Sequence, residues 1–254
     1  MDRLLEETYR AEQKHFWFHG FRQFVRPLLA EATAGLTSPR LLDCGCGTGA
    51  NLRLLDEFGV AFGFDLTWRG LEFARQSGRA GVAQASVTAI PVGSAAIDVV
   101  TSFDVLYCLP DPAERLAIAE MHRVLRPGGA LIVNSAAFDM LHGDHSVLDG
   151  EVRRYTTRQL RQKLEQAGFD VVRITYTNAV LFPLLAVVRA AQRLRVLRPL
   201  DQSRGDFVVP PTPVNALLAG ALSIEARLVA AGMNMPVGSS VLCLAKKAGV
   251  PAHG

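Results

Sequence analysis

The chain has 254 residues, 49% of them hydrophobic and 20% charged, and a formal net charge of +3. This length allows one large domain with its own core, and so small a charge gives no reason to expect nucleic acid as a partner. The N-terminal sequence MDRLLEETYR has acids where a signal peptide needs basic and then apolar residues. The cysteines show neither a disulfide framework nor paired CxxC spacing, so we expect a cytoplasmic protein without a bound metal; they are Cys44, Cys46, Cys108 and Cys243.

Residues 3–34 are predicted to be helical, as two amphipathic stretches separated by the aromatic sequence His15-Phe16-Trp17-Phe18. After Gly35 and Pro39, strand and helix patterns alternate, which predicts a parallel sheet with helices on both faces. The predicted strands cover residues 40–44, 61–65, 81–85, 97–103, 130–135, 171–176 and 240–246. The predicted helices cover residues 50–58, 70–77, 112–125 and 157–167.

Two apolar segments, 180–198 and 214–231, lie between the last two predicted strands and are separated by a proline-containing linker. The uninterrupted apolar part of the first is about ten residues long, well short of the ~20 that span a bilayer. We interpret residues 178–235 as a lid over a partly apolar substrate. A dimer contact and a peripheral contact of residues 180–198 with the inner membrane face are the alternatives, the latter because the segment carries Arg189, Arg193, Arg195 and Arg198. The oligomeric state is left open.

A glycine-rich loop, Asp43-Cys44-Gly45-Cys46-Gly47-Thr48-Gly49, closes the first predicted strand and opens a helix. Glycines let a ligand approach the backbone closely, and the start of the helix offers unpaired N–H groups. About twenty residues further on, Asp65 ends the second strand, where it can accept both hydroxyls of a ribose. The loop therefore predicts a ribose-bearing cofactor at the carboxyl edge of the sheet.

The same loop leaves two cofactor classes open. Gly45, Gly47 and Ala50 satisfy the dinucleotide pattern GxGxxG/A, which is typical of nicotinamide and flavin oxidoreductases. Asp43 argues against them, because a carboxylate two residues before the first glycine would repel a pyrophosphate but suits a cationic amino-acid group.

Three features in register resemble class I S-adenosylmethionine-dependent methyltransferases over residues 36–177: the Asp-x-Gly-x-Gly-x-Gly loop, the acid Asp65 and the turn Leu125-Arg126-Pro127-Gly128-Gly129. The resemblance implies S-adenosylmethionine as cofactor. It also implies a Rossmann-like α/β fold with a seven-stranded, mostly parallel sheet and an antiparallel last strand. The implied division is an N-terminal helical cap (1–35), a cofactor-binding core (36–177 plus 236–249) and a helical insertion (178–235).

The resemblance also assigns cofactor-binding positions. Asp43 and Gly45 would lie beside the methionine moiety with Gly47 beneath it, Asp65 would bind the ribose, and Leu66 would pack on the adenine. The other positions are Cys46 and Asn51 in and after the loop, Ser86 and Val87 after the third strand, and Phe103 near the sulfonium. Two departures from the family pattern stand out: Ser86-Val87 replace an acid and a small residue, and Cys108 replaces a common histidine.

The N-terminal pattern Glu12…His15-Phe16-Trp17-Phe18…Arg22 resembles the opening of a subgroup of these enzymes, often encoded among polysaccharide- and lipid-modifying functions. Phe18 would cap the cofactor and favour its sulfonium by cation–π attraction. Arg22 would pair with the cofactor carboxylate. The alternative interpretation is a hydrophobic staple on the edge of the sheet.

The sequence after the fifth predicted strand resembles the subgroup's His-Asp…His-x-Arg-Arg-Tyr segment, which ends here at Tyr155. A loop in this place faces the donor methyl group, so His145 or Glu151 is the candidate general base, and Tyr155 is the third candidate catalytic residue. The alternatives are surface ion pairs of Glu151 with the arginines beside it and a metal site built from His142, Asp144 and His145.

We therefore predict a methyltransferase that acts on a small or lipid-linked metabolite, methylating a hydroxyl by in-line displacement. Within the same class, the alternative is C-methylation of an isoprenoid-like or aromatic substrate. From other classes, the alternatives are a non-catalytic cofactor-binding accessory protein and a nicotinamide-dependent oxidoreductase.

Overall fold

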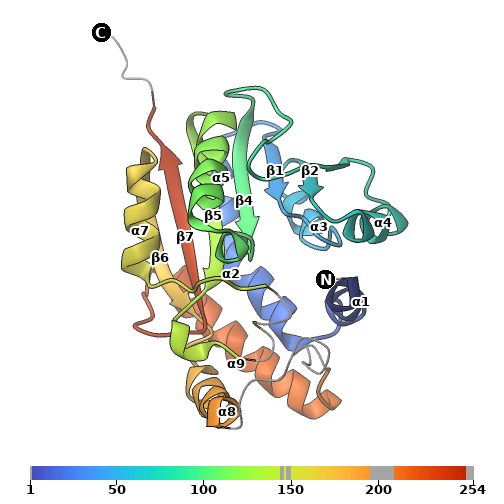
Figure 1. Ribbon diagram of the computed structural model, residues 1–254, viewed down its shortest axis with the longest axis vertical. Coiled ribbons are helices and arrows are strands. Elements are labelled where there is room, and N and C mark those ends of the chain that lie inside the picture. Colours follow the sequence, from blue (N-terminus) through green and yellow to red (C-terminus); the bar gives the residue numbers. More distant parts are fainter. Residues whose placement is uncertain (1, 144–145, 147–149, 195–208, 250–254) are drawn as a thin grey trace.

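The computed structural model describes residues 2–143, 146, 150–194 and 209–249, which contain a seven-stranded sheet (Figure 1). The strands are β1 (Arg40–Cys44), β2 (Val60–Asp65), β3 (Val82–Gln84), β4 (Ile97–Phe103), β5 (Leu125–Ala136), β6 (Phe169–Thr177) and β7 (Ser240–Lys247). Their order is β3-β2-β1-β4-β5-β7-β6. Neighbouring strands from β3 to β5 are parallel, and β7 is antiparallel to both β5 and β6. The predicted Rossmann-like α/β sheet with an antiparallel last strand is confirmed.

Helices pack against both faces of this sheet. They are α1 (Asp2–Ala11), α2 (Phe16–Thr33), α3 (Leu52–Leu55), α4 (Trp68–Gln76), α5 (Asp111–Val124), α7 (Thr157–Gln166), α8 (Phe182–Leu194) and α9 (Thr212–Ala230), with short 3₁₀ turns η1 (Leu106–Cys108) and η2 (Asp139–Leu141). Successive strand residues point to opposite faces. Leu42 and Val100 accordingly share one core with α5 and α7, whereas Leu41 and Val99 share the other with α2, α3, α4 and α9.

Two of the predicted strands and helices differ from their observed bounds by three or more residues at one end. The helix predicted over 50–58 is reduced to α3, and the following residues form a turn. A Cβ on Gly59 would lie 2.2 Å from the Pro39 oxygen, so the chain must leave the helix early to pass close to the start of β1. The strand predicted over 130–135 begins earlier, because Leu125 already pairs with Ile97. The Arg-Pro-Gly-Gly residues therefore form an irregularity inside β5.

The N-terminal segment forms two helices, as predicted, but the aromatic residues open the second helix instead of separating the two. The His15 ring accepts a hydrogen bond from the Trp17 N–H at 3.2 Å and so caps the start of α2. The first helix packs on α4, where the Tyr9 ring stacks on Phe73 with centroids 4.4 Å apart. These contacts bring α1 next to the glycine-rich loop.

The segment between β6 and β7 contains α8 and α9. A Cβ on Gly20 would lie 2.5 Å from Leu222 Cδ1, so α2 and α9 are in close contact. The buried Glu225 carboxylate of α9 accepts the backbone N–H groups of Ala179 at 2.9 Å and Val180 at 3.0 Å, just before α8. Figure 1 shows both helices beyond the carboxyl ends of β1 and β4. The division of the chain into cap, core and insertion remains a prediction.

Candidate functional site

The glycine-rich loop leaves β1 in a conformation that requires glycine. Gly45 has φ +85°, and a Cβ there would lie 2.3 Å from Val105 Cγ2. The N–H groups of Gly45 and Cys46 both donate to the Phe64 carbonyl, at 2.8 and 2.9 Å. These bonds fasten the loop to the end of β2. The carboxyl ends of β1 and β2 therefore form one continuous backbone surface.

Asp65, at the end of β2, is bound to this loop. One carboxylate oxygen accepts the Gly47 N–H at 2.8 Å, and the other accepts the Thr67 N–H at 2.8 Å together with the Thr67 hydroxyl. A carboxylate offers about four acceptor positions, so these bonds orient Asp65 and still permit a ligand hydroxyl. The contact of Asp65 with a ribose remains a prediction.

Asp43 is buried at the end of β1, with 1% of its surface exposed. Its carboxylate accepts the Thr101 hydroxyl at 2.7 Å. The pKa of Asp43 is raised to about 7, mainly by burial and also by the nearby Asp65, whereas the Thr101 hydrogen bond opposes the shift. A cationic group placed beside Asp43 would favour its ionised form.

The aromatic residues of the site come from β4 and α2. Phe103, at the end of β4, meets Phe21 of α2 edge to face, with ring centroids 5.0 Å apart. Phe18 lies edge to face with His15 at 6.2 Å. Phe18 and Phe103 are expected here from the sequence, whereas Phe21 is not. The helical spacing of three residues from Phe18 was the signal that could have found it.

Arg22 and Glu12 bring the N-terminal segment to the loop. The Glu12 carboxylate is buried and accepts the Thr48 hydroxyl at 2.6 Å, and Arg22 donates to the Glu12 carbonyl at 3.0 Å. Burial raises the pKa of Glu12 to about 7, against the effects of the Thr48 hydrogen bond and of Arg22. A cavity of about 460 Å³ lies here, lined in part by Arg22, Thr48, Gly49 and Arg53. Arg22, the predicted partner of the cofactor carboxylate, therefore lies beside the glycine-rich loop.

The remaining loop positions are close to the same edge. The side chain of Cys46 is buried against β2, since a Cβ on Gly63 would lie 2.9 Å from its Sγ, so any ligand contact is made by its backbone. Asn51 lies directly before α3.

The predicted adenine contacts lie at the ends of β2 and β3. Leu66 is exposed directly after β2, and Val87 is buried. The Ala85 N–H donates to the Asp65 carbonyl at 3.1 Å, which holds the segment after β3 beside the end of β2. The Ser86 hydroxyl is engaged with the Thr88 hydroxyl at 2.7 Å.

Glu151 is held in an ion pair with Arg154, whose guanidinium contacts both carboxylate oxygens at 2.7 and 2.8 Å. Both side chains are largely buried. The same guanidinium donates to the Ser146 hydroxyl at 2.9 Å. The pair orders the segment after η2. The sequence allowed an ion pair of Glu151 with a neighbouring arginine as an alternative, and the structure contains one, although it is buried and not on the surface. His145, the other candidate base, lies outside the described residues.

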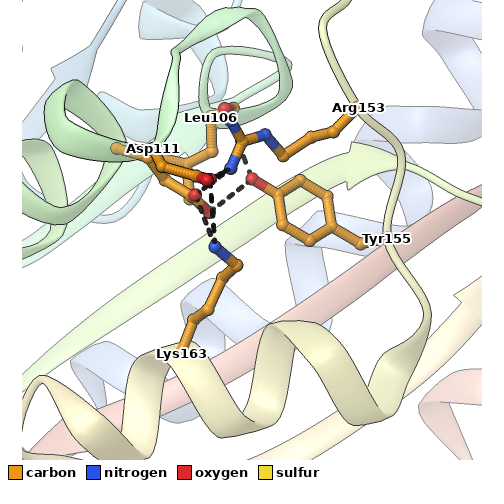
Figure 2. Close-up of polar contacts among 6 residues, drawn as sticks. Leu106, Asp111, Arg153, Tyr155 and Lys163 are labelled. Carbon is orange, nitrogen blue, oxygen red and sulfur yellow. Dashed lines mark hydrogen bonds and ion pairs between the residues drawn. The ribbon is translucent and has the colours of Figure 1, made fainter.

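Tyr155 lies in a polar cluster between α5 and α7 (Figure 2). Its hydroxyl donates to Glu114 at 2.6 Å and to the Leu106 carbonyl at 3.3 Å. Glu114 also pairs with Arg153 and, at 2.6 Å, with Lys163. Burial raises the pKa of Tyr155 far above its usual range, and Glu114 adds to the shift. This geometry suits a residue that supports the fold.

Asp104 follows Phe103 directly and has φ +60°, which is uncommon for a residue other than glycine. Its side chain accepts the Asn134 amide at 2.9 Å, and its N–H donates to the Asn134 carbonyl at 3.0 Å.

Among the described residues, no group of three or more His, Cys, Asp or Glu side chains is placed to hold a metal. The proposed metal ligands Asp144 and His145 lie outside that part of the chain.

Comparison with known proteins agrees with this geometry. Residues 42–133 match the family model described as "Methyltransferase domain", and this segment contains the loop, Asp65 and β4. Over the whole chain, the fold is similar to a putative methyltransferase in complex with the Haloferax volcanii Trm112 methyltransferase activator. That match has a TM-score of 0.61 and 16% identity, and it covers 99% of this chain and 97% of the other.

Two curated relatives are similar over the core. A probable S-adenosylmethionine-dependent methyltransferase of Mycolicibacterium smegmatis is 29% identical over 63% of this chain and 61% of its own length. The demethylspheroidene O-methyltransferase of Rhodobacter capsulatus is 32% identical over 61% of this chain and 41% of its own length. The chain thus matches less than two thirds of the length of these relatives.

Proposed function

We propose that this chain, whose residues 42–133 match the family model of a methyltransferase domain, uses S-adenosylmethionine to methylate a hydroxyl of a small or lipid-linked metabolite. The observation that supports it best is the joined set of Asp43, the glycine-rich loop and Asp65 at one edge of the sheet. A buried acid suits the donor's ammonium, and an oriented carboxylate suits its ribose. Two relatives with S-adenosylmethionine-dependent methyltransferase and O-methyltransferase in their names support the donor and the acceptor atom.

The reaction is a displacement at the methyl carbon. The acceptor oxygen forms a bond to that carbon while the carbon–sulfur bond breaks, and the sulfur keeps the electron pair. The protein's task is alignment and the exclusion of water. In this proposal Phe103 and Phe21 present aromatic surface to the positive sulfur, and Arg22 pairs with the donor's carboxylate.

The acceptor's hydroxyl proton needs a base. We assign this role to His145 by its place in the sequence after β5. Glu151 is the weaker candidate, because both of its carboxylate oxygens already accept hydrogen bonds from Arg154. Tyr155 is assigned to the support of the fold.

Donor binding and methyl transfer are tested separately. S-adenosylhomocysteine should raise the melting temperature of the chain, and Asp65→Ala should remove most of that increase, whereas NAD should have no effect. His145→Asn should keep the increase and lose methyl transfer from labelled S-adenosylmethionine to a hydroxyl acceptor. An increase with NAD alone would support the oxidoreductase alternative instead. Binding without transfer to any hydroxyl acceptor would contradict O-methylation.

Donor affinity should depend on pH through Asp43, whose pKa lies at about 7 instead of its usual 3.8. The raised pKa means that Asp43 favours the fold below about pH 4 and that this contribution is lost as the pH rises through 7. The ammonium of S-adenosylhomocysteine requires the ionised carboxylate. Calorimetry should therefore give a roughly tenfold lower Kd at about pH 8 than at about pH 6.

The matched variants for this experiment are Asp43→Asn and Glu12→Gln. Asp43→Asn should bind more weakly and with little pH dependence. Glu12→Gln removes the other carboxyl group whose pKa is raised to about 7, and it should keep the pH dependence. If the pH dependence disappears in Glu12→Gln and persists in Asp43→Asn, its cause is Glu12 and the assignment to Asp43 is wrong.

A further inference from the structure

Helix α9 has two apolar faces. One packs on α2 through Leu222 and Ala226. The other is exposed, with Leu217 exposing 73% of its surface, and it also contains Val214, Ile224 and Leu228. Among the described residues, α9 is the one helix long and apolar enough to cross a membrane by length and composition, yet only 22% of its apolar window is buried. Because Glu225 on its inner face is bonded to the chain before α8, we place α9 along a surface and not across a bilayer.

Helix α8 also has exposed apolar side chains. Leu184, Val187 and Val188 are exposed, Val187 by 68%, on a helix of apolar composition. A contact between the Phe138 and Phe182 rings, with centroids 5.9 Å apart, joins the start of α8 to the end of β5. Met140 on η2, next to α8, is also exposed. Exposed apolar side chains gathered on one helix in this way are typical of a binding surface.

The charge of the chain is concentrated in the same segment. Residues 178–235 contain six arginines and three acidic residues, so they carry the whole formal net charge of +3. Among the charged side chains described in this segment, Arg227 is exposed, whereas Arg189 and the acid Glu225 are buried. An exposed surface that is apolar and basic is complementary to an anionic bilayer. Two copies of the same surface would instead bring like charges together.

We propose that the exposed faces of α8 and α9 dock the chain on an anionic lipid bilayer. Both helices lie at the end of the molecule to which β1 and β4 point (Figure 1), and the Phe138 contact connects α8 to the chain that leaves β5. The docked surface therefore adjoins the edge of the sheet that carries the proposed donor site. The docking rests on the proposed function only in that an acceptor with a lipid chain would reach the site from the bilayer.

Sedimentation with vesicles tests the docking. The full chain should bind vesicles that contain phosphatidylglycerol, and binding to phosphatidylcholine alone should be much weaker. Leu217→Glu and Val187→Glu should each lower the partition coefficient roughly tenfold, because each replaces inserted apolar surface with a charge. The matched control is Leu116→Glu, an exposed apolar residue of α5 on the other face of the sheet, which should bind as the unchanged chain does.

Light scattering measures the oligomeric state of each variant, and the binding of S-adenosylhomocysteine measures whether it is folded. A thermal shift with S-adenosylhomocysteine that is unchanged in the variants will show that they are folded. Absence of binding to anionic vesicles, or full binding by both variants, would overturn the proposal. So would a dimer that dissociates in Leu217→Glu and does not bind vesicles. Vesicle binding by a chain without any S-adenosylhomocysteine response would contradict the proposed function and support the docking.

Discussion

Gly45→Ala should weaken the binding of S-adenosylhomocysteine and lower the rate of methyl transfer by roughly 100-fold, because a displacement of about 1 Å in a positioning loop can have an effect of this size on rate. The new Cβ would lie 2.3 Å from Val105 Cγ2. The left-handed φ of +85° adds a cost of about 1–2 kcal/mol for a side chain. The loop must therefore move, although the N–H groups of residues 45 and 46 hold it to the Phe64 carbonyl. Calorimetry of the variant with S-adenosylhomocysteine measures the loss.

Gly78→Ala separates backbone conformation from crowding in this experiment. Gly78 has φ +81°, close to that of Gly45, but no atom lies within 4 Å of the Cβ it would gain. It should lose about 1 kcal/mol of stability from conformation alone and bind S-adenosylhomocysteine normally. Equal losses of affinity in both variants would show that the contact with Val105 is not the cause.

Glu114→Ala should lower the free energy of unfolding by about 3–5 kcal/mol, the usual cost of removing one partner from a buried ion pair. Glu114 is 0% exposed and accepts from Arg153, Lys163 and the Tyr155 hydroxyl. The alanine leaves two cations and a hydroxyl without this partner between α5 and α7 (Figure 2). Urea unfolding at neutral pH gives the difference.

Two other variants calibrate this loss. Tyr155→Phe removes the hydrogen bonds of the hydroxyl to Glu114 and to the Leu106 carbonyl and should cost about 1–2 kcal/mol. Arg161→Ala removes an exposed pair with Glu165, at 3.3 Å, and should cost no more than about 0.5 kcal/mol. Tyr155→Phe should also retain methyl transfer at temperatures where it is folded. A loss below about 1 kcal/mol for Glu114→Ala would mean that the cluster does not hold the helices together.

The sheet and the donor side of the site were predictable because their signals are local. Each strand of the core has a short apolar pattern of its own, and the glycine-rich loop and Asp65 lie at the ends of two of them. Parallel strands bring those ends to one edge. The hydrogen bond from Gly47 to Asp65 is therefore a direct result of two patterns that the sequence displays separately.

The surroundings of Glu151 and Tyr155 were less predictable because their contacts join distant residues. Tyr155 and Glu114 are 41 positions apart, and no periodicity links a carboxylate inside α5 to a tyrosine in a loop. The Arg-Arg-Tyr sequence predicts residues close to the donor methyl group. In the structure, Arg153 and Tyr155 contact Glu114, and Arg154 pairs with Glu151. Helix propensity also failed to indicate the early end of α3, which depends on the approach of Gly59 to Pro39.

The two ends of the segment that carries α8 and α9 are bonded to each other. The Asn178 amide donates to the Ser239 hydroxyl at 3.1 Å, and the Ser239 N–H donates to the Thr177 carbonyl at 3.0 Å. The β6–β7 hairpin is thus closed at its base, whatever lies between these residues. In evolution, such a base lets the intervening chain lengthen, shorten or change its composition while the sheet keeps its register. Acceptor preference can then diverge among relatives that retain one donor site.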